Sequence, residues 1–174
     1  MKSFSDFFNC EEKEILDKTD EFHQVLTHLR YEGKVSSGKN VKASLKAVRE
    51  LGKIIQRHRN LQEKIIFPFL ETHIPRQESV IHFLRTDHRD IQKSLLELEM
   101  SLRRFLKNSH EGVQNGILQE MGVYFISFLR HHIGFENKGI HQAMRKELRK
   151  DEKLEVKRKI NLWLAHHPES VGKI

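Results

Sequence analysis

Residues 81–105 read IHFLRTDHRDIQKSLLELEMSLRRF, the most regular pattern in the chain. Apolar residues recur there at alternating steps of three and four, which is the spacing of one face of an α-helix. A single polar residue, His88, takes a place in this apolar stripe. The stripe consists of Ile81, Leu84, His88, Ile91, Leu95, Leu98, Leu102 and Phe105. The pattern predicts a long helix over about residues 76–107 that buries one face, with a histidine in the buried face.

Three more segments repeat this pattern on either side of residues 81–105. Asn9 followed by Glu12 predicts a helix that is capped at Asn9 and ends near Tyr31. After a linker at 33–40, a second helix is expected over about 41–70, and a fourth follows the NSHEG turn at 108–112. The stripes of these helices include His23, His58 and His132, one histidine each. Long amphipathic helices with short connections predict an all-α, up-down-up-down four-helix bundle.

The C-terminal part carries a further helical pattern and much of the positive charge. Residues 151–167 place Val156, Ile160, Trp163 and Leu164 on one face. We therefore divide the chain into a bundle at 9–145 and a basic C-terminal helical extension at 146–174 that packs on the bundle. The net charge is +7, but the run of lysines and arginines from Arg145 to Lys159 has no interleaved aromatic residues for stacking on bases. Nucleic acid is disfavoured as a partner.

Composition excludes several classes of protein and site. With Cys10 as the sole cysteine, an intramolecular disulfide, a zinc–thiolate cluster and a cysteine-ligated iron–sulfur cluster are excluded. No apolar run approaches the roughly 20 residues of a membrane span, and the first residues lack the apolar core of a signal peptide. We expect a soluble, cytoplasmic protein without a membrane partner, and its oligomeric state stays open. Histidines and carboxylates must hold any metal.

The positions of the four histidines along the bundle axis test whether they can bind the same metal ion. In two antiparallel helices, residues that are equally far from the connecting turn lie at the same level along that axis. The pair His58 and His88 centres on residue 73, and the pair His88 and His132 centres on residue 110, both inside expected turns. The pair His23 and His58 meets only if the first helix continues about a turn past its expected end. Glu136 lies four residues after His132, on the same helix face. These positions predict a metal site of imidazoles and a carboxylate.

The same residues resemble a known family. Three segments, RHRNLQEKIIFPFL from Arg57, FLRTDHRDIQKSL around His88 and FLRHHIGFENKGI from Phe128, are similar in order and spacing to the hemerythrin-like (HHE) family. The resemblance covers about residues 15–145. It implies a bundle with a bridged di-iron centre, used for oxygen binding, for sensing of oxygen, redox state or iron, or for nitric oxide and peroxide chemistry. It implies as ligands His23, His58, His88, His132 and a bridging Glu136.

One position departs from the family pattern. Alignment on Phe67 and Pro68 puts Gln62 where the second bridging glutamate is expected, with Glu63 next to it. On an ideal helix Glu63 lies about 100° around from Gln62, so it reaches the site only through a local bulge or a shifted register. With Glu136 as the one carboxylate, two divalent ions leave an excess positive charge in the core. Either Glu63 is a further metal ligand, or the second metal ion binds weakly or is absent.

We interpret the chain as a metal-binding protein that holds iron, as one or two ions, with zinc as the alternative metal. A small diatomic molecule or peroxide is the expected ligand, and binding or sensing is preferred to enzymatic turnover. A metal-free helical adaptor, which binds an acidic partner through the basic C-terminal segment, is the competing interpretation. The remaining histidines are expected to be mostly solvated, although His131 could support the site. They are His28, His73, His82, His110, His131, His141, His166 and His167.

Overall fold

The computed structural model describes residues 4–31, 37–107 and 114–167, and it confirms the all-α prediction for them. No helix in these ranges is long and apolar enough to cross a membrane. The elements in chain order are α1 (Phe4–Tyr31), α2 (Ser37–Leu61), η1 (Gln62–Ile66), α3 (Phe67–His73), η2 (Pro75–Gln77), α4 (Glu78–Lys107), α5 (Gln114–Glu136), η3 (Asn137–His141), α6 (Gln142–Glu147) and α7 (Lys150–His166). Both η1 and η3 are turns of π-helix, whereas η2 is a 3₁₀ turn.

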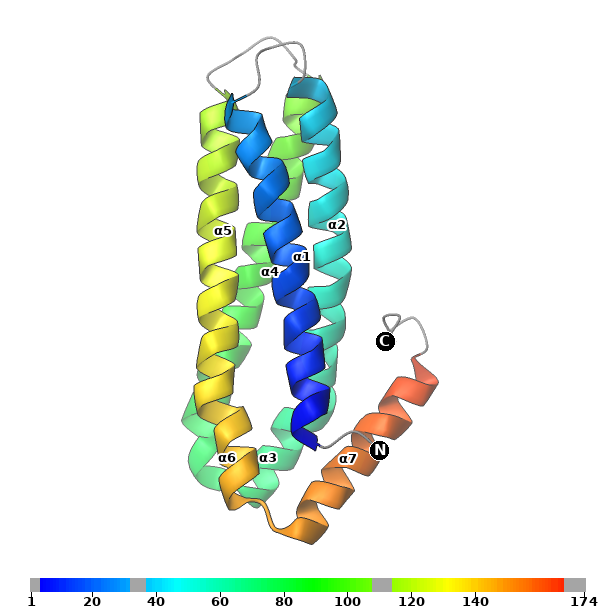
Figure 1. Cartoon of the computed structure of the whole chain (residues 1–174). Helices are drawn as coiled ribbons and strands as arrows, with labels where there is room; N and C mark the ends of the chain where they lie inside the picture. Colours follow the sequence, from blue (N-terminus) through cyan, green and yellow to red (C-terminus); the bar gives the residue numbers. More distant parts are fainter. Residues whose placement is uncertain (1–3, 32–36, 108–113, 168–174) are drawn as a thin grey trace.

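The four long helices α1, α2, α4 and α5 lie side by side as a bundle (Figure 1). In that view α1 runs upward, α2 returns, α4 runs upward and α5 returns. Each helix packs against two neighbours, so that α1, α2, α4 and α5 enclose a common core. This closed arrangement follows from the sequence, because each helix has one apolar stripe and buries it only when all four stripes face inward.

The first two helices begin earlier than the sequence pattern indicated. α1 starts at Phe4, so Asn9 lies inside the helix and the predicted cap at Asn9 is wrong. α2 starts at Ser37, which makes the first connection shorter than the linker expected at 33–40. The NSHEG turn at 108–112 lies outside the described residues. The shorter first connection changes which residues of α1 lie level with the histidines.

The buried apolar residues form two clusters. The upper cluster includes the α2 residues up to Ile55, the α4 residues from Ile91 and the α5 residues up to Ile133. The lower cluster begins at Leu61 on α2 and includes the α4 residues up to Leu84, together with η3 and α6. Between the two, each helix passes through a short stretch where the buried side chains are polar. The bundle core therefore contains a polar layer between two apolar layers.

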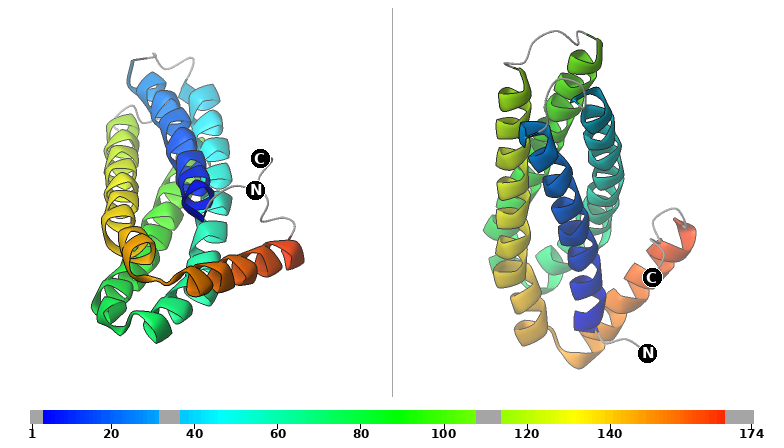
Figure 2. Two further views of the ribbon diagram at one scale, coloured as in Figure 1. Left: turned by 60° about the horizontal axis from the view of Figure 1, so that its bottom comes forward. Right: turned by 45° about the horizontal axis from the view of Figure 1, so that its top comes forward.

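α7 leaves the lower end of the bundle at an angle to the long helices (Figure 2). Its first turn is capped by Glu152, whose Oε2 accepts a hydrogen bond of 2.8 Å from the backbone N–H of Arg149. On its inner face Val156, Ile160 and Trp163 are buried in the lower cluster. α7 thus packs on the bundle, while the division of the chain into 9–145 and 146–174 stays a prediction.

Candidate metal centre

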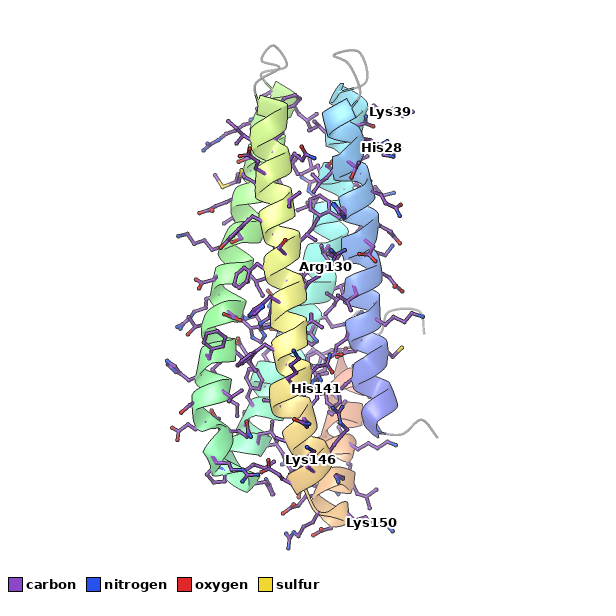
Figure 3. The ribbon with its side chains drawn as sticks, turned by 60° about the vertical axis from the view of Figure 1, so that its left-hand side comes forward. His28, Lys39, Arg130, His141, Lys146 and Lys150 are labelled. Carbon is purple, nitrogen blue, oxygen red and sulfur yellow. The ribbon has the colours of Figure 1, made fainter. Side chains whose placement is uncertain are left out.

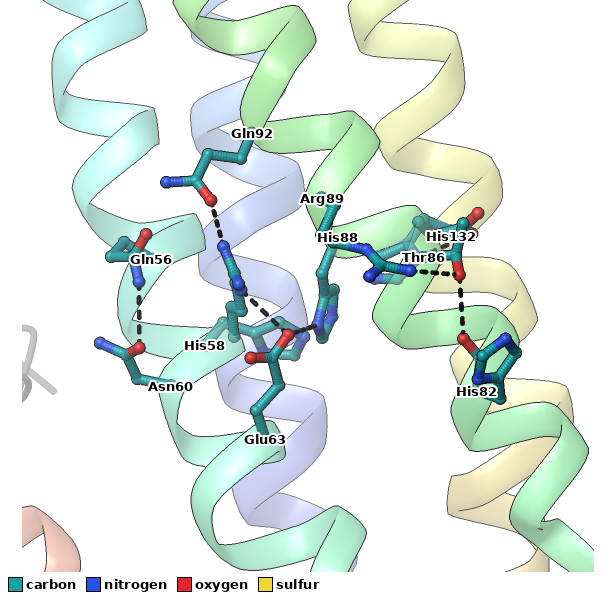
Figure 4. Close-up of polar contacts among 12 residues, drawn as sticks. Gln56, His58, Asn60, Glu63, His82, Thr86, His88, Arg89, Gln92 and His132 are labelled. Carbon is teal, nitrogen blue, oxygen red and sulfur yellow. Dashed lines mark hydrogen bonds and ion pairs between the residues drawn. The ribbon is translucent and has the colours of Figure 1, made fainter.

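Four of the predicted site residues meet in the polar layer of the core. His58 lies on α2, His88 on α4, and His132 and Glu136 on α5. Their exposed fractions are 4%, 4%, 1% and 0%, in that order. The close-up in Figure 4 shows the three histidines approaching one another from different helices. Three long helices therefore each bring an imidazole to one buried place.

Glu136 lies at the centre of this group. Its Oε1 is 2.9 Å from Nε2 of His132 and 3.6 Å from Nε2 of His88. Its Oε2 is 3.1 Å from Nε2 of His58. One ligand atom each from His88, His132 and Glu136 lie within 4.8 Å of one another. The carboxylate thus has two imidazoles at one oxygen and the third imidazole at the other.

The donor atoms of this group converge without satisfying one another. Nε2 of His88, Nε2 of His132 and Oε1 of Glu136 are buried and lack a hydrogen-bond partner, even though two of them are close. A buried polar atom left without a partner costs about 1–3 kcal/mol. Imidazole nitrogens and carboxylate oxygens are the ligands that iron and zinc take in proteins. The residues therefore fit a metal ion, which would satisfy all three atoms at once.

The electrostatics keep Glu136 ionised. Burial would raise the pKa of Glu136, but the imidazoles of His58 and His132 outweigh it and hold that pKa well below its usual range. Burial would also lower the pKa of His58, yet the carboxylates of Glu136 and Glu11 raise it to about 10. The pKa of His132 is likewise raised by Glu136 and Asp87 against the effect of burial. Without a metal, Glu136 is therefore paired electrostatically with His58 and His132.

Two carboxylates fix the orientation of the imidazoles from behind. His88 donates from Nδ1 to Oε1 of Glu63 over 3.0 Å, the contact drawn in Figure 4. His132 donates from Nδ1 to Oδ2 of Asp87 over 3.1 Å. Since an ionised carboxylate only accepts, each Nδ1 carries a proton, and each Nε2 faces Glu136. This is the arrangement in which a ligating histidine is oriented by a carboxylate beyond it.

The prediction that Glu63 is a metal ligand needs correction. A π-helical turn does occur at Gln62–Ile66, where a bulge was expected. Glu63, however, lies on the Nδ1 side of His88, away from Glu136, and its Oε1 also accepts from Nε of Arg59 at 2.9 Å. Arg59 and His88 outweigh partial burial and lower the pKa of Glu63. Gln62 is fully buried, and both polar atoms of its amide lack a partner.

The prediction that His23 joins the site is also contradicted. His23 is exposed on α1, outside the buried group. The connection between Tyr31 and Ser37 sets the heights of α1 and α2, and it makes His58 level with the turn that contains Glu11. His23 was predicted from its place in the stripe of the first helix and from the family resemblance, and it met His58 only if that helix continued past Tyr31, where α1 ends.

α1 contributes carboxylates in place of the histidine. Glu11 and Glu12 are both buried, and Oε2 of Glu11 is 3.7 Å from Nδ1 of His58. Oε1 of Glu12 is 2.7 Å from Nδ1 of His141, which is buried as well. Neither glutamate was predicted, although the heights of the two helices would have indicated Glu11 once the first connection was placed correctly.

The burial of His141 corrects its assignment as a solvated residue. On a regular α-helix it would lie about 140° around from Glu136, facing outward. The π-helical turn η3 has wider i→i+5 hydrogen bonding and turns His141 back toward α1. Figure 3 shows Arg130 on α5 and His141 on its continuation η3, and both bind carboxylates of α1. The sequence carries no clear signal for such a turn.

Most of the other histidines lie where the sequence indicated. Five are exposed, and none of these five belongs to the buried group. They are His28, His82, His131, His166 and His167. His73 is half-buried, and its Nδ1 lies 2.8 Å from the carbonyl oxygen of Phe69. His110 lies outside the described residues.

Comparison with known proteins identifies the family. No curated protein matches the chain. The family model described as the hemerythrin HHE cation binding domain matches residues 9–150. That range contains the four bundle helices from residue 9 onward and the whole buried group around Glu136. The chain belongs to the hemerythrin HHE cation-binding domain family.

Proposed function

We propose that this protein binds iron in its core through His88, His132 and Glu136. The observation that carries the proposal is that His88, His132 and Glu136 each offer a ligand atom within 4.8 Å of the others. Each of the three also has a buried donor atom without a hydrogen-bond partner. Two imidazoles and one carboxylate with remaining positions open are the typical donors of non-heme iron sites. Thiolate ligands are absent from this set, which favours iron over a structural zinc site.

A second ion, on the other side of Glu136, would complete a di-iron centre. Oε2 of Glu136 and Nε2 of His58, 3.1 Å apart, are the protein donors available there. Two protein donors hold an ion less tightly than three, so we expect the second position to fill at higher metal concentration. Asp87, Glu63 and Glu11 behind the imidazoles add the negative charge that Glu136 alone does not supply. They support a second ion without ligating it.

The surroundings of the centre favour a small ligand. Apolar clusters lie above and below the polar layer, and Glu136 is fully buried, so it is shielded from bulk water. Iron bound there would supply Lewis acidity and redox chemistry toward a diatomic molecule or peroxide. The protein residues hold the metal and restrict access to it. We therefore propose oxygen, nitric oxide, redox or iron sensing or binding as the role of the centre.

The adaptor interpretation gains no specific support from the charges of α7. Several basic side chains of this region are engaged locally: Arg149 pairs with Glu152, and Lys159 pairs with Glu155. Lys153 donates to the backbone carbonyl of Arg145. Since these groups already have partners, an acidic protein would compete with contacts inside the chain.

The proposal is tested by comparing His88→Ala with His82→Ala, which changes an exposed histidine on the same helix. Both variants are loaded with iron, desalted and analysed for metal per chain, and helix content is measured by circular dichroism. We expect His88→Ala to lose the metal with little loss of helix, and His82→Ala to retain it. Full metal retention by His88→Ala would contradict the proposal.

A further inference from the structure

Every imidazole that faces Glu136 has a carboxylate at its Nδ1 side, and each carboxylate comes from the preceding part of the bundle. The carboxylate of Glu11 on α1 faces His58 on α2. The carboxylate of Glu63 on η1 faces His88 on α4, and that of Asp87 on α4 faces His132 on α5. The Nδ1-to-oxygen distances are 3.7, 3.0 and 3.1 Å, respectively. The centre is therefore surrounded by a second layer of negative charge.

The three carboxylates differ in how far cations offset their charge. Glu63 binds Nε of Arg59 at 2.9 Å. Glu11 lies 3.7 Å from Nε of Arg57, and both of these side chains are about 10% exposed. Asp87 is 6% exposed and forms no ion pair with a lysine or arginine of the described chain. Asp87 thus puts the least compensated negative charge next to a predicted metal ligand.

A charge in this position acts on the metal through the imidazole. The carboxylate holds the Nδ1 proton, which fixes the ring so that Nε2 faces the ion and makes Nε2 a stronger donor. Its negative charge also attracts the ion directly, and this attraction grows with the charge of the ion. A ferric ion therefore gains more from the carboxylate than a ferrous ion does.

We propose that Asp87 is a positioning residue that strengthens metal binding through His132 and stabilises the ferric over the ferrous state. Glu63 acts in the same way, with smaller effect because Arg59 offsets its charge. Glu11, whose Oε2 is 3.7 Å from Nδ1 of His58, is beyond hydrogen-bond distance and acts through its charge alone, which Arg57 offsets in part. This inference rests on the proposed iron site. It assigns to Asp87 a role that its side chain performs without touching the metal.

The test compares Asp87→Asn, Glu63→Gln and Glu11→Gln with Asp90→Asn, which removes an exposed charge from the same helix as Asp87. Affinity is measured by titrating the metal-free full chain with iron(II), and the reduction potential of the loaded protein is measured by redox titration. We expect Asp87→Asn to weaken binding about 10- to 100-fold, the range seen when such supporting carboxylates are removed. Its potential should rise, the glutamine variants should change less, and Asp90→Asn should match the wild type.

Two further variants separate charge from packing. Asp87→Glu keeps the charge and should restore most of the affinity. Arg59→Gln removes the cation beside Glu63, so the charge of Glu63 should act in full and the potential should fall. This variant also tests the proposal if Asp87→Asn does not fold.

The outcomes distinguish this inference from the function on which it rests. If the wild-type chain binds no iron, the proposed function fails. If the wild type binds iron but Asp87→Asn keeps its affinity and potential, the inference is overturned while the function stands. A rise or no change in potential for Arg59→Gln also overturns the inference.

Discussion

The upper apolar cluster and the polar layer below it are built from the same helices. In the upper cluster the inward positions of α1, α2, α4 and α5 carry aliphatic and aromatic side chains such as Phe22, Leu51 and Phe125. A few turns lower, the same helix faces carry imidazoles and carboxylates around Glu136. The three-and-four spacing of inward positions is common to both layers. The layers differ in the type of residue that occupies those positions. One helix pattern therefore specifies both a stabilising layer and a binding layer.

The two layers contribute to stability in opposite ways. Apolar burial contributes about 25 cal/mol for each Å² removed from water. Burying ionised groups costs several kcal/mol each, which pairing only partly offsets. The polar layer thus lowers the free energy of unfolding until a cation binds to it. Changes in the upper cluster should alter stability without altering metal binding, whereas changes in the polar layer should alter metal binding and the pH dependence of stability.

The largest effect on stability is expected in the upper cluster. Phe125→Ala removes a ring that is 1% exposed and leaves a cavity, so the free energy of unfolding should fall by about 3–5 kcal/mol. Denaturant unfolding measures this change, and Tyr124→Ala, at a residue 65% exposed, is the control. Folded Phe125→Ala should still bind metal with wild-type stoichiometry. Loss of metal from the folded variant would show that the layers are not independent.

The stability of the metal-free protein should depend on pH through the polar layer. The pKa of His58 is raised from its ordinary 6.5 to about 10, so its contribution is complete below 6.5 and is lost as the pH rises toward 10. Glu136, with its lowered pKa, contributes above its ordinary value of 4.5 and loses that contribution on acidification. The thermal midpoint of chelator-treated protein should therefore fall between pH 6.5 and 10.

His58→Gln is the control for this pH dependence, because it removes the titrating imidazole. Its thermal midpoint should change less between pH 6.5 and 10 than that of the wild type. Equal slopes in the two proteins would mean that the polar layer does not control the alkaline loss of stability.

A smaller effect is expected where α1 and α5 approach closely in the upper cluster. A Cβ at Gly122 would overlap the buried side chain of Leu26, whereas one at Gly116 would meet nothing within 4 Å. Gly122→Ala should cost about 1–3 kcal/mol through overpacking. Gly116→Ala should add up to about 1 kcal/mol, because alanine favours the helix. Equal thermal midpoints for the two variants would rule out a close approach of these helices.

The smallest effect is expected on the bundle surface. Glu99 on α4 binds Arg49 on α2 at 2.9 Å and Arg103 at 2.5 Å, and the two arginines lower its pKa. Exposed ion pairs contribute about 0–1 kcal/mol. Glu99→Gln should therefore reduce the free energy of unfolding by at most about 1 kcal/mol, and the difference should vanish in high salt. A larger loss that persists in salt would indicate that packing, not charge, is disturbed.

Much of the fold and part of the site could be predicted from the sequence. The stripes on α2, α4 and α5 are dense, and their histidines are related by turns with clear signals, so His58, His88 and His132 were placed together correctly. Glu136 followed from its i+4 relation to His132. In these helices the spacing along the sequence is sufficient to predict which residues share the buried face, because the α-helical rotation per residue is constant.

The remaining errors have two physical causes. The position of α1 along the bundle depends on where its connection to α2 lies, and the polar residues at 33–40 gave no sharp boundary. His23, which the stripe and the family resemblance indicated, therefore was not tested sharply, and Glu11 was missed. The π-helical turns η1 and η3 change the rotation after Leu61 and Glu136, which turned Glu63 behind His88 and brought His141 inside. Such turns depend on packing between helices, which local propensity does not encode.

The most direct test of an iron-binding polar layer is the metal content of the full chain purified from iron-supplemented cells. Elemental analysis gives the iron per chain, and the visible absorption spectrum reports its ligation. We expect at least one tightly held iron per chain, rising toward two as the position beside His58 fills. A folded, helical protein that retains no metal after desalting would contradict the central claim that the polar layer is a metal centre.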